Sequence, residues 1–293
     1  MTRGLAAVLA VLLPAACTRQ GPAPGQIHYT VGAPYQAGGV WRYPQESVRY
    51  DATGLAVVQQ GGAQRITADG ERYDPAATAG AHPTLPLPSV VRVTNLDTGR
   101  QLLLRLNDRG PADPGRLIAL TPAAAALLGI PRDGVARVRV QLEVAPSEAL
   151  RDALGAGPKG LAAPVGTVTA EALPPPGSSL SRGPARVLGT DRTAESVAPP
   201  ADLSATAIQV PPQPGALWLD LGEFHEPGYA QQRRARLASL GPEIERDGSG
   251  RSALWRVHAG PFATVADADN AMDQARRAGV FDATITAQRD PGQ

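Results

Sequence analysis

The stretch Val90–Pro111, VVRVTNLDTGRQLLLRLNDRGP, decides the fold of the first half of this chain. It predicts a β-hairpin, because two runs of β-prone residues flank the turn residues Asp97-Thr98-Gly99. In the second run, alternate leucines and Asp108 share one parity. We therefore expect them to project from the same face of the sheet.

Asp108 stands at the end of this apolar face, where an ordinary solvated acid is not expected. A carboxyl group beside apolar walls has a raised pKa and can hold a proton for donation. The alternative is a turn-capping aspartate whose oxygens bond the backbone of the following Arg-Gly-Pro bend. Spacing alone leaves both interpretations open.

The segments around the hairpin predict a compact β-barrel. Short strands and turns run from Gly54 to Val144, and Thr121-Pro122 supplies an N-cap and a first-turn proline for one helix that Gly129 ends. Val135–Val144 then alternates apolar and mostly polar residues, as a half-buried strand does. We assign residues 50–145 to this barrel.

Composition excludes several kinds of function. The 293 residues suffice for two domains, and a net charge of +1 gives no argument for a nucleic-acid partner. The single cysteine rules out an intramolecular disulfide and any multi-cysteine metal site. The four histidines show no metal-ligand spacing.

The N-terminus predicts export. Residues 1–17 combine an early arginine, the short apolar core Leu5–Leu13 and small residues before Cys17. The core is too short to remain as a membrane-spanning helix. Cys17 after two alanines resembles a lipoprotein processing site, with simple cleavage near Ala16 as the alternative. Residues 18–49 follow as a polar tether and an aromatic-rich extension.

The second half divides into a linker and a small domain. Residues 146–214 are rich in Pro, Ala, Gly, Ser and Thr, a composition that predicts a flexible linker with at most a brief helical turn at Glu148–Leu154. Residues 215–290 show the order β-α-β-β-α-β, which predicts an α+β fold with two helices on one face of a sheet.

Several segments of the barrel region, in the same order, resemble the rare lipoprotein A family. They are YDATGLA at Tyr50–Ala56, TADGERYD at Thr67–Asp74, AHPTLPLPSVVRVTNLDTGR at Ala81–Arg100, LRLNDRGP at Leu104–Pro111 and RLIALTPAAAALLGI at Arg116–Ile130. The resemblance implies a mainly β, six-stranded double-psi β-barrel. It also implies a lytic transglycosylase that cleaves peptidoglycan glycan strands lacking stem peptides, leaves 1,6-anhydro-muramyl ends and needs no cofactor or metal.

The same resemblance implies three catalytic residues. Asp108 would be the acid/base, Glu71 would stabilise positive charge at the reacting carbon or act as the second carboxylate, and His82 would orient a carboxylate or bond the sugar. Glu71 as a solvated turn acid and His82 as a structural hydrogen-bonding group near the Pro83 bend stay open as alternatives.

Two departures from the family pattern keep a second function open. Val57–Gly61 has no aromatic residue, whereas family members usually carry Ser-Trp-Tyr-Gly there, and Ala119 replaces an aspartate. Aromatic faces contribute strongly to sugar contacts. The expected functions are therefore a transglycosylase of cell division and daughter-cell separation, or a catalytically inactive envelope lipoprotein that binds peptidoglycan.

The C-terminal domain resembles the SPOR (sporulation-related repeat) domain in LWLDLGEF at Leu217–Phe224 and LWRVHAGPF at Leu254–Phe262. This resemblance implies binding to denuded septal glycan. The candidate contact residues on the sheet are Trp218, Asp220, Arg256 and His258. Core packing of Trp218 and Trp255 is an alternative, as is an RNA-binding module, which the balanced charge disfavours.

The expected partners follow from these assignments. They are denuded septal glycan strands and a membrane reached through a lipid on Cys17, with no nucleic acid. We expect a monomer in the bacterial cell envelope, anchored and facing the periplasm, or free in the periplasm if Cys17 carries no lipid.

Overall fold

The structure, a computed structural model, describes residues 27–60, 65–156, 206–250 and 253–288. The expected export signal, the expected lipidation site Cys17, the tether and most of the linker lie outside these residues. Within them, no helix has the length and apolar character that crossing a membrane would require.

The first domain is a closed barrel of six strands, as the resemblance implied. The strands run in the order β4-β7-β3-β8-β5-β6, and β4 pairs with β6 to close the ring. They are β3 Asp51–Val58, β4 Ala79–Ala81, β5 Ser89–Asn95, β6 Arg100–Asp108, β7 Ile118–Leu120 and β8 Val135–Leu142. Most contacts are antiparallel, but β3–β7 and β4–β6 are parallel.

The predicted hairpin is confirmed as the pair β5–β6. Val93 pairs with Leu102 and Ser89 with Leu106, and Gly99 takes a positive φ of 73° in the connecting turn. A side chain is disfavoured in this left-handed region, so the turn requires glycine. Alternate residues of β6 are buried in the barrel core, and this burial fixes the register.

The predicted helix is α1, Pro122–Leu127. Thr121 caps it by accepting a hydrogen bond from the Ala124 amide, and Gly129 follows with a positive φ of 74°. The cap, the first-turn proline and the terminal glycine therefore act as the sequence indicated.

Two elements lie within the stretch that we expected to be linker. α2, Val144–Ala153, is a 10-residue helix rather than a brief turn, and it packs on β5, where the Val90 amide donates to Ser147 Oγ over 2.9 Å. β9, Ile208–Gln209, pairs with the outer edge of β6. The Val210 amide then donates to Gly99 O over 2.8 Å. Both ends of this stretch are thus bound to the barrel.

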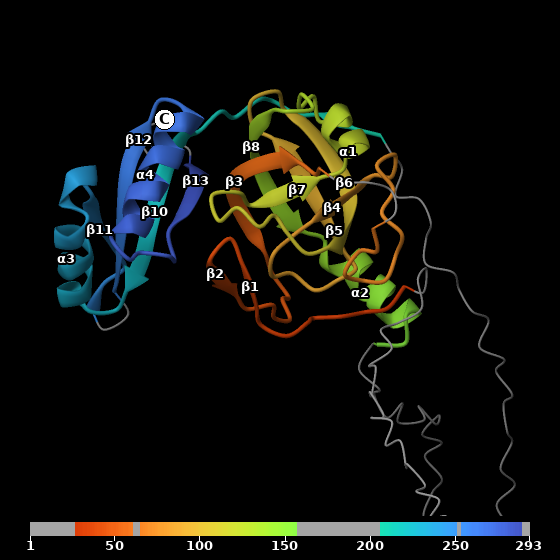
Figure 1. Cartoon of the computed structure of the whole chain (residues 1–293), viewed down its shortest axis with the longest axis horizontal. Helices are drawn as coiled ribbons and strands as arrows, with labels where there is room; N and C mark the ends of the chain where they lie inside the picture. Colours follow the sequence, from red (N-terminus) through yellow and green to blue (C-terminus); the bar gives the residue numbers. More distant parts are fainter. Residues whose placement is uncertain (1–26, 61–64, 157–205, 251–252, 289–293) are drawn as a thin grey trace, which may run out of the picture.

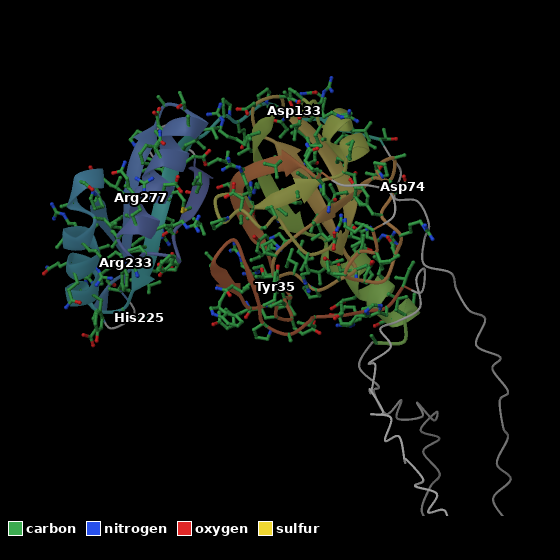
Figure 2. All side chains as sticks on the ribbon, in the orientation of Figure 1. Tyr35, Asp74, Asp133, His225, Arg233 and Arg277 are labelled. Atoms are coloured by element: carbon green, nitrogen blue, oxygen red, sulfur yellow. The ribbon has the colours of Figure 1, made fainter. Side chains whose placement is uncertain are left out.

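The aromatic-rich extension covers one end of the barrel. It contains a small hairpin of β1, Tyr35–Ala37, and β2, Val40–Arg42. The hydroxyl of Tyr35, labelled in Figure 2, donates to Pro83 O over 3.0 Å. This contact joins the extension to the segment that carries His82.

The C-terminal domain has the predicted β-α-β-β-α-β order. Its elements are β10 Ala216–Phe224, α3 Pro227–Arg236, the 3-10 turn η1 Ala238–Leu240, β11 Glu243–Asp247, β12 Leu254–Phe262, α4 Val265–Arg277 and β13 Thr284–Gln288. The sheet order is β11-β12-β10-β13, and all pairs are antiparallel. Small residues of both helices pack on one face, which confirms the predicted two-layer fold.

The two domains touch along a seam in which β13 lies beside β3 (Figure 1). Leu55 of β3 is fully buried, and it packs in the same apolar cluster as Leu219 and Ile285 of the C-terminal domain. Arg116 of the barrel binds Asp269 of α4 through two hydrogen bonds of 2.6 and 2.8 Å. The C-terminal domain is therefore docked on the barrel by both apolar and ionic contacts.

Candidate functional site

Asp108 lies at the end of β6, where the strand meets the turn of residues 67–71. It is 4% exposed, and its Oδ1 accepts hydrogen bonds from the Ala68 amide at 3.0 Å and the Arg109 amide at 2.8 Å. One of these donors belongs to the bend after Asp108, so part of the predicted capping geometry is present. The second donor ties the strand end to the turn.

The other oxygen of Asp108 faces two side chains. Oδ2 forms an ion pair with Arg65 and accepts a 3.1 Å hydrogen bond from Gln59 Nε2. With donors on both oxygens, a proton can sit on Oδ2 only if Arg65 or Gln59 moves. Asp108 is thus held as a hydrogen-bond acceptor, and not in the apolar surroundings that its position on the leucine face suggested.

Glu71 lies in the adjoining turn and is held by two side chains of β6. Its Oε1 is 2.5 Å from Arg105 Nη2, and its Oε2 accepts from Asn107 Nδ2 over 2.8 Å. The side chain is 12% exposed, so this carboxylate is held in place rather than solvated. Because Asn107 adjoins Asp108, the strand end brings both predicted acids to one end of the barrel.

His82 lies under the site and contacts no carboxylate side chain in the part of the chain that the structure describes. Its Nδ1 accepts from the Thr84 and Leu85 amides at 3.2 and 3.1 Å, and its Nε2 is 3.0 Å from the Tyr50 hydroxyl. Two donors at Nδ1 place the ring proton on Nε2, which donates to Tyr50. Complete burial, followed by the charges of Arg109 and Arg42, lowers the pKa of His82 to about 3, so the ring is neutral.

Asp69 is a carboxyl group of this site that sequence reasoning missed. It is fully buried, and its Oδ1 accepts from the Thr67 hydroxyl at 2.7 Å and the Glu71 amide at 3.2 Å. Burial, and secondarily the charge of Glu71, raises the pKa of Asp69 to about 6. Its place in the TADGE turn was visible in the sequence, but its burial depends on contacts with distant parts of the chain.

The raised pKa of Asp69 gives a testable pH dependence of stability. Folding raises this pKa from 3.8 to about 6, so the associated stabilisation is complete below pH 4 and is lost as the pH rises through 6. Between pH 4 and pH 7 the unfolding free energy of Asp69→Asn should therefore gain about 2 kcal/mol relative to wild type. Urea unfolding of both proteins at the two pH values measures this change, and a pH-independent difference would contradict it.

A cleft of about 330 Å³ opens beside these groups. Its lining includes Val57, Gln59, Arg65, Ala81, Arg109 and Ala119. Both departures from the family pattern therefore lie in this wall: the stretch without aromatic residues that begins at Val57, and Ala119 in place of an aspartate. Asp108 does not line the cleft, but Arg65 and Gln59, which bond its Oδ2, do.

Arg109 holds the segment that carries His82 against the strand end. Its guanidinium donates to Leu85 O at 2.5 Å, to Val31 O at 2.6 Å and to His82 O at 3.3 Å. Sequence reasoning did not single out Arg109, because its acceptors are backbone carbonyls far away along the chain. The half-buried Arg109 side chain thus joins the extension and the His82 segment to β6.

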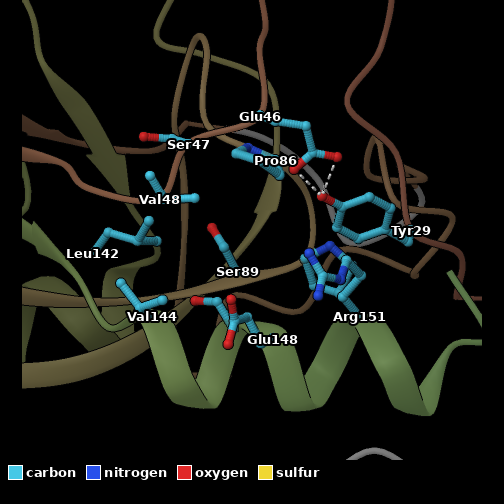
Figure 3. Close-up of a pocket in the computed structure, with 12 residues that line it drawn as sticks. Tyr29, Glu46, Ser47, Val48, Pro86, Ser89, Leu142, Val144, Glu148 and Arg151 are labelled. Carbon is cyan, nitrogen blue, oxygen red and sulfur yellow. Dashed lines mark hydrogen bonds between the residues drawn. The ribbon is translucent and has the colours of Figure 1, made fainter. Parts of the chain in front are cut away.

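A second hollow lies between the extension, α2 and the start of β5, and it contains none of the predicted site residues (Figure 3). It holds about 50 Å³. The Tyr29 hydroxyl donates to the Glu46 carboxylate there, with oxygen distances of 2.8 and 2.9 Å. The volume is too small for a sugar unit, so we place the candidate site at the larger cleft.

The four predicted residues of the C-terminal sheet lie on its face opposite the helices. Asp220 pairs with His258 across β10–β12, and the Trp218 ring meets the His258 ring edge-on at 5.1 Å. Arg256 donates to Glu223 Oε1 over 2.8 Å, a bond that raises the pKa of Arg256. The structure therefore brings the four predicted residues together on one partly exposed surface.

The two tryptophans of this domain have different environments. Trp255 packs against the apolar cluster beneath the helices. Trp218 has the opposite parity to its buried neighbours Leu217 and Leu219, so it lies on the open face. The core-packing alternative therefore applies to Trp255, whereas Trp218 remains a candidate for glycan contact.

The barrel site offers acid–base chemistry. It combines a hydrogen-bond-accepting carboxylate whose partners line a cleft, and a second carboxylate that is held by two side chains in the adjoining turn. Among the described residues, no three side chains of the His, Cys, Asp or Glu type lie together in a metal-binding arrangement. The chemistry that the arrangement provides is proton transfer beside a sugar-sized cleft.

Comparisons with known proteins match both domains. Residues 52–140 match the family model described as "Lytic transglycolase", and residues 213–286 match the one described as "SPOR domain". The chain is 31% identical over 237 residues to "Endolytic peptidoglycan transglycosylase RlpA" of Pseudomonas aeruginosa strain UCBPP-PA14, which covers 75% of this chain and 66% of that relative. The chain thus spans slightly less than two thirds of that relative's length.

Two further matches concern a longer alignment and a solved structure. The chain is 27% identical over 311 residues to the protein of the same name from Escherichia coli K12, which covers 89% of this chain and 85% of the relative. The "Crystal structure of RlpA SPOR domain from Pseudomonas aeruginosa" matches 25% of this chain and 99% of that one, at 24% identity and a TM-score of 0.23.

Proposed function

Because the chain belongs to the RlpA (rare lipoprotein A) family, with a lytic transglycosylase barrel and a SPOR domain, we propose that it cleaves peptidoglycan glycan strands. The proposed substrate is a strand without stem peptides. The reaction is non-hydrolytic: the C6 hydroxyl of a muramic acid unit attacks its own C1 and leaves a 1,6-anhydro end.

Asp108 is the acid and base of this mechanism. It first gives a proton to the oxygen that leaves C1, and the resulting carboxylate then takes the proton of the attacking C6 hydroxyl. Proton donors and acceptors balance within the sugar and this one side chain. The Ala68 and Arg109 amides keep Oδ1 fixed during both steps.

Glu71 and His82 support Asp108 in different ways. Glu71, held by Arg105 and Asn107, supplies negative charge near the positive charge that develops at C1. His82 is a positioning residue: its neutral ring holds Tyr50 and two amides of its own loop. This loop pairs with β6, since the His82 amide donates to Asp108 O over 3.1 Å.

One observation carries this proposal above the others. Asp108 and Glu71 are both held at the end of β6, and the side chains that bond Asp108 form the wall of a sugar-sized cleft.

The SPOR domain extends the proposal to cell division. We propose that its open face, with Trp218 and His258, binds denuded septal glycan and concentrates the protein there. The protein would then act in the cell envelope during daughter-cell separation. A lipid on Cys17 would anchor it facing the periplasm, and a chain without this lipid would be free in the periplasm.

A second candidate function is a peptidoglycan-binding lipoprotein without turnover. Two observations favour it. The stretch Val57–Gly61 places no aromatic residue in the cleft wall and Ala119 replaces an acidic one there, and Arg65 covers Asp108. Apolar side chains without ring faces bind sugars less well. In this case the barrel would hold a glycan strand without cleaving it.

Incubation of the purified protein with denuded sacculi separates the two candidates. The enzyme should release soluble fragments with 1,6-anhydro-muramic ends, which mass spectrometry identifies. Binding to the sacculi without any such fragments would support the non-catalytic function. Intact sacculi that retain their stem peptides serve as the control substrate and should release far less.

A further inference from the structure

The carboxylate of Asp108 is covered on the cleft side by Arg65 and Gln59. Both side chains line the cleft, and both contact Asp108 Oδ2. Asp108 is only 4% exposed and does not line the cleft itself. A sugar that enters the cleft therefore meets Arg65 before it can reach Asp108.

The guanidinium of Arg65 uses only part of its hydrogen-bonding capacity in this position. Its guanidinium lies over the Tyr73 ring at 4.7 Å, and one nitrogen, Nη1, pairs with Asp108. The other terminal nitrogen, Nη2, is buried and has no hydrogen-bond partner among the described residues. Because a guanidinium pairs best with a carboxylate through two parallel hydrogen bonds, Arg65 can make a better ion pair than its present one.

Gln59 has an unpaired acceptor in the same cleft wall as the unpaired donor of Arg65. Its Nε2 donates to Asp108, but its buried Oε1 has no hydrogen-bond partner in the part of the chain that the structure describes. One wall of the cleft thus contains an unused cationic donor and an unused acceptor. A ligand with a carboxylate near a hydroxyl or an amide N–H would satisfy both.

We propose that Arg65 binds the carboxylate of the glycan substrate and, by doing so, releases Asp108 for catalysis. The proposal rests on the function proposed above and adds the feature of the substrate that is recognised. Each muramic acid unit carries a lactyl carboxyl group, which is a free carboxylate only where no stem peptide is attached. A stem peptide converts it to a neutral amide, which cannot replace Asp108 as the ionic partner of Arg65.

The exchange couples recognition to chemistry. When Arg65 turns to the substrate, Asp108 keeps the Ala68 and Arg109 amides on Oδ1, and Oδ2 retains only Gln59. Oδ2 then has room for the proton that the mechanism requires. The same movement of Arg65 therefore selects strands without stem peptides and exposes the Asp108 carboxyl group.

The test uses two forms of one probe: a denuded glycan oligosaccharide with free lactyl carboxylates, and the same oligosaccharide with those groups methyl-esterified. Wild-type protein should form 1,6-anhydro products from the free acid at least about tenfold faster than from the ester, at low substrate concentration. Arg65→Gln should lose this preference, and Arg65→Lys should keep part of it. Arg132→Gln, at an exposed position outside the cleft, should behave as wild type.

A binding measurement makes the test independent of turnover. In an Asp108→Asn background, the full-length protein should bind the free acid at least about tenfold more tightly than the ester, and adding Arg65→Gln should abolish that difference. Equal treatment of both probes by wild type, or an unchanged preference in a folded Arg65→Gln variant, would overturn the proposal. If no protein forms products but the binding preference depends on Arg65, the proposed enzymatic function fails and carboxylate recognition stands.

Discussion

The Asp108→Asn variant should lose between about 10²- and 10⁴-fold of the rate at which 1,6-anhydro fragments leave denuded sacculi. Asparagine can still accept the Ala68 and Arg109 amides through its oxygen. It cannot give or take the proton that the leaving oxygen and the C6 hydroxyl require. The measurement is the initial rate of product formation, quantified by mass spectrometry.

Asp133→Asn provides the matched control for this loss. Asp133, labelled in Figure 2, lies exposed in the turn before β8 and does not line the cleft. Its replacement removes one carboxylate in the same chemical way and should leave the rate unchanged. Thermal unfolding of both variants separates lost chemistry from lost folding. An unchanged rate in folded Asp108→Asn would remove Asp108 from the mechanism.

Leu55→Asp should separate the two domains and lower the free energy of unfolding by about 3 to 5 kcal/mol. Leu55 is fully buried in the cluster that it shares with Leu219 and Ile285. A carboxylate there has no cationic partner within the cluster, so undocking is the least costly response. Small-angle X-ray scattering should show a larger radius of gyration, and unfolding should become two separate transitions.

Leu103→Asp is the matched control for Leu55→Asp, because it introduces the same charge at an exposed leucine of the barrel. Leu103 lies on β6 of the same barrel but is 37% exposed. An aspartate at this position keeps its solvation, so both the radius of gyration and the unfolding free energy should change little. A compact Leu55→Asp protein with a single unfolding transition would contradict the docked arrangement.

The parts of the fold that sequence predicted are those that local residues specify. The β5–β6 hairpin follows from its alternating residues and from Gly99, and α1 follows from Thr121, Pro122 and Gly129. In each case the residues that decide the conformation lie within a few positions of the element. The interior of α2 gave a weaker signal, because Pro146 and the Ala-rich composition around it resemble the linker that follows.

The candidate site was less predictable, because its electrostatics depend on distant residues. The position of Asp108 on the leucine face predicted apolar surroundings, but Arg65, 43 positions away, lies on its oxygen. The burial of Asp69 and the two unpaired groups of Arg65 and Gln59 likewise arise only when the turn of residues 67–71 meets β6. No periodicity or spacing within one segment encodes such contacts.

The pairing of β9 with β6 determines which part of the chain sets the distance between the two domains. α2 packs on β5 of the barrel, and β9 pairs with β6 of the same barrel. The number of residues between these two elements therefore does not set the distance between the barrel and the SPOR domain. After β9 the Val210 amide donates to Gly99 O, the Gln213 amide donates to Leu96 O, and Gly215 O accepts from Arg137 Nη1. The chain therefore passes directly from the barrel into β10 at Ala216, and this junction connects the two domains.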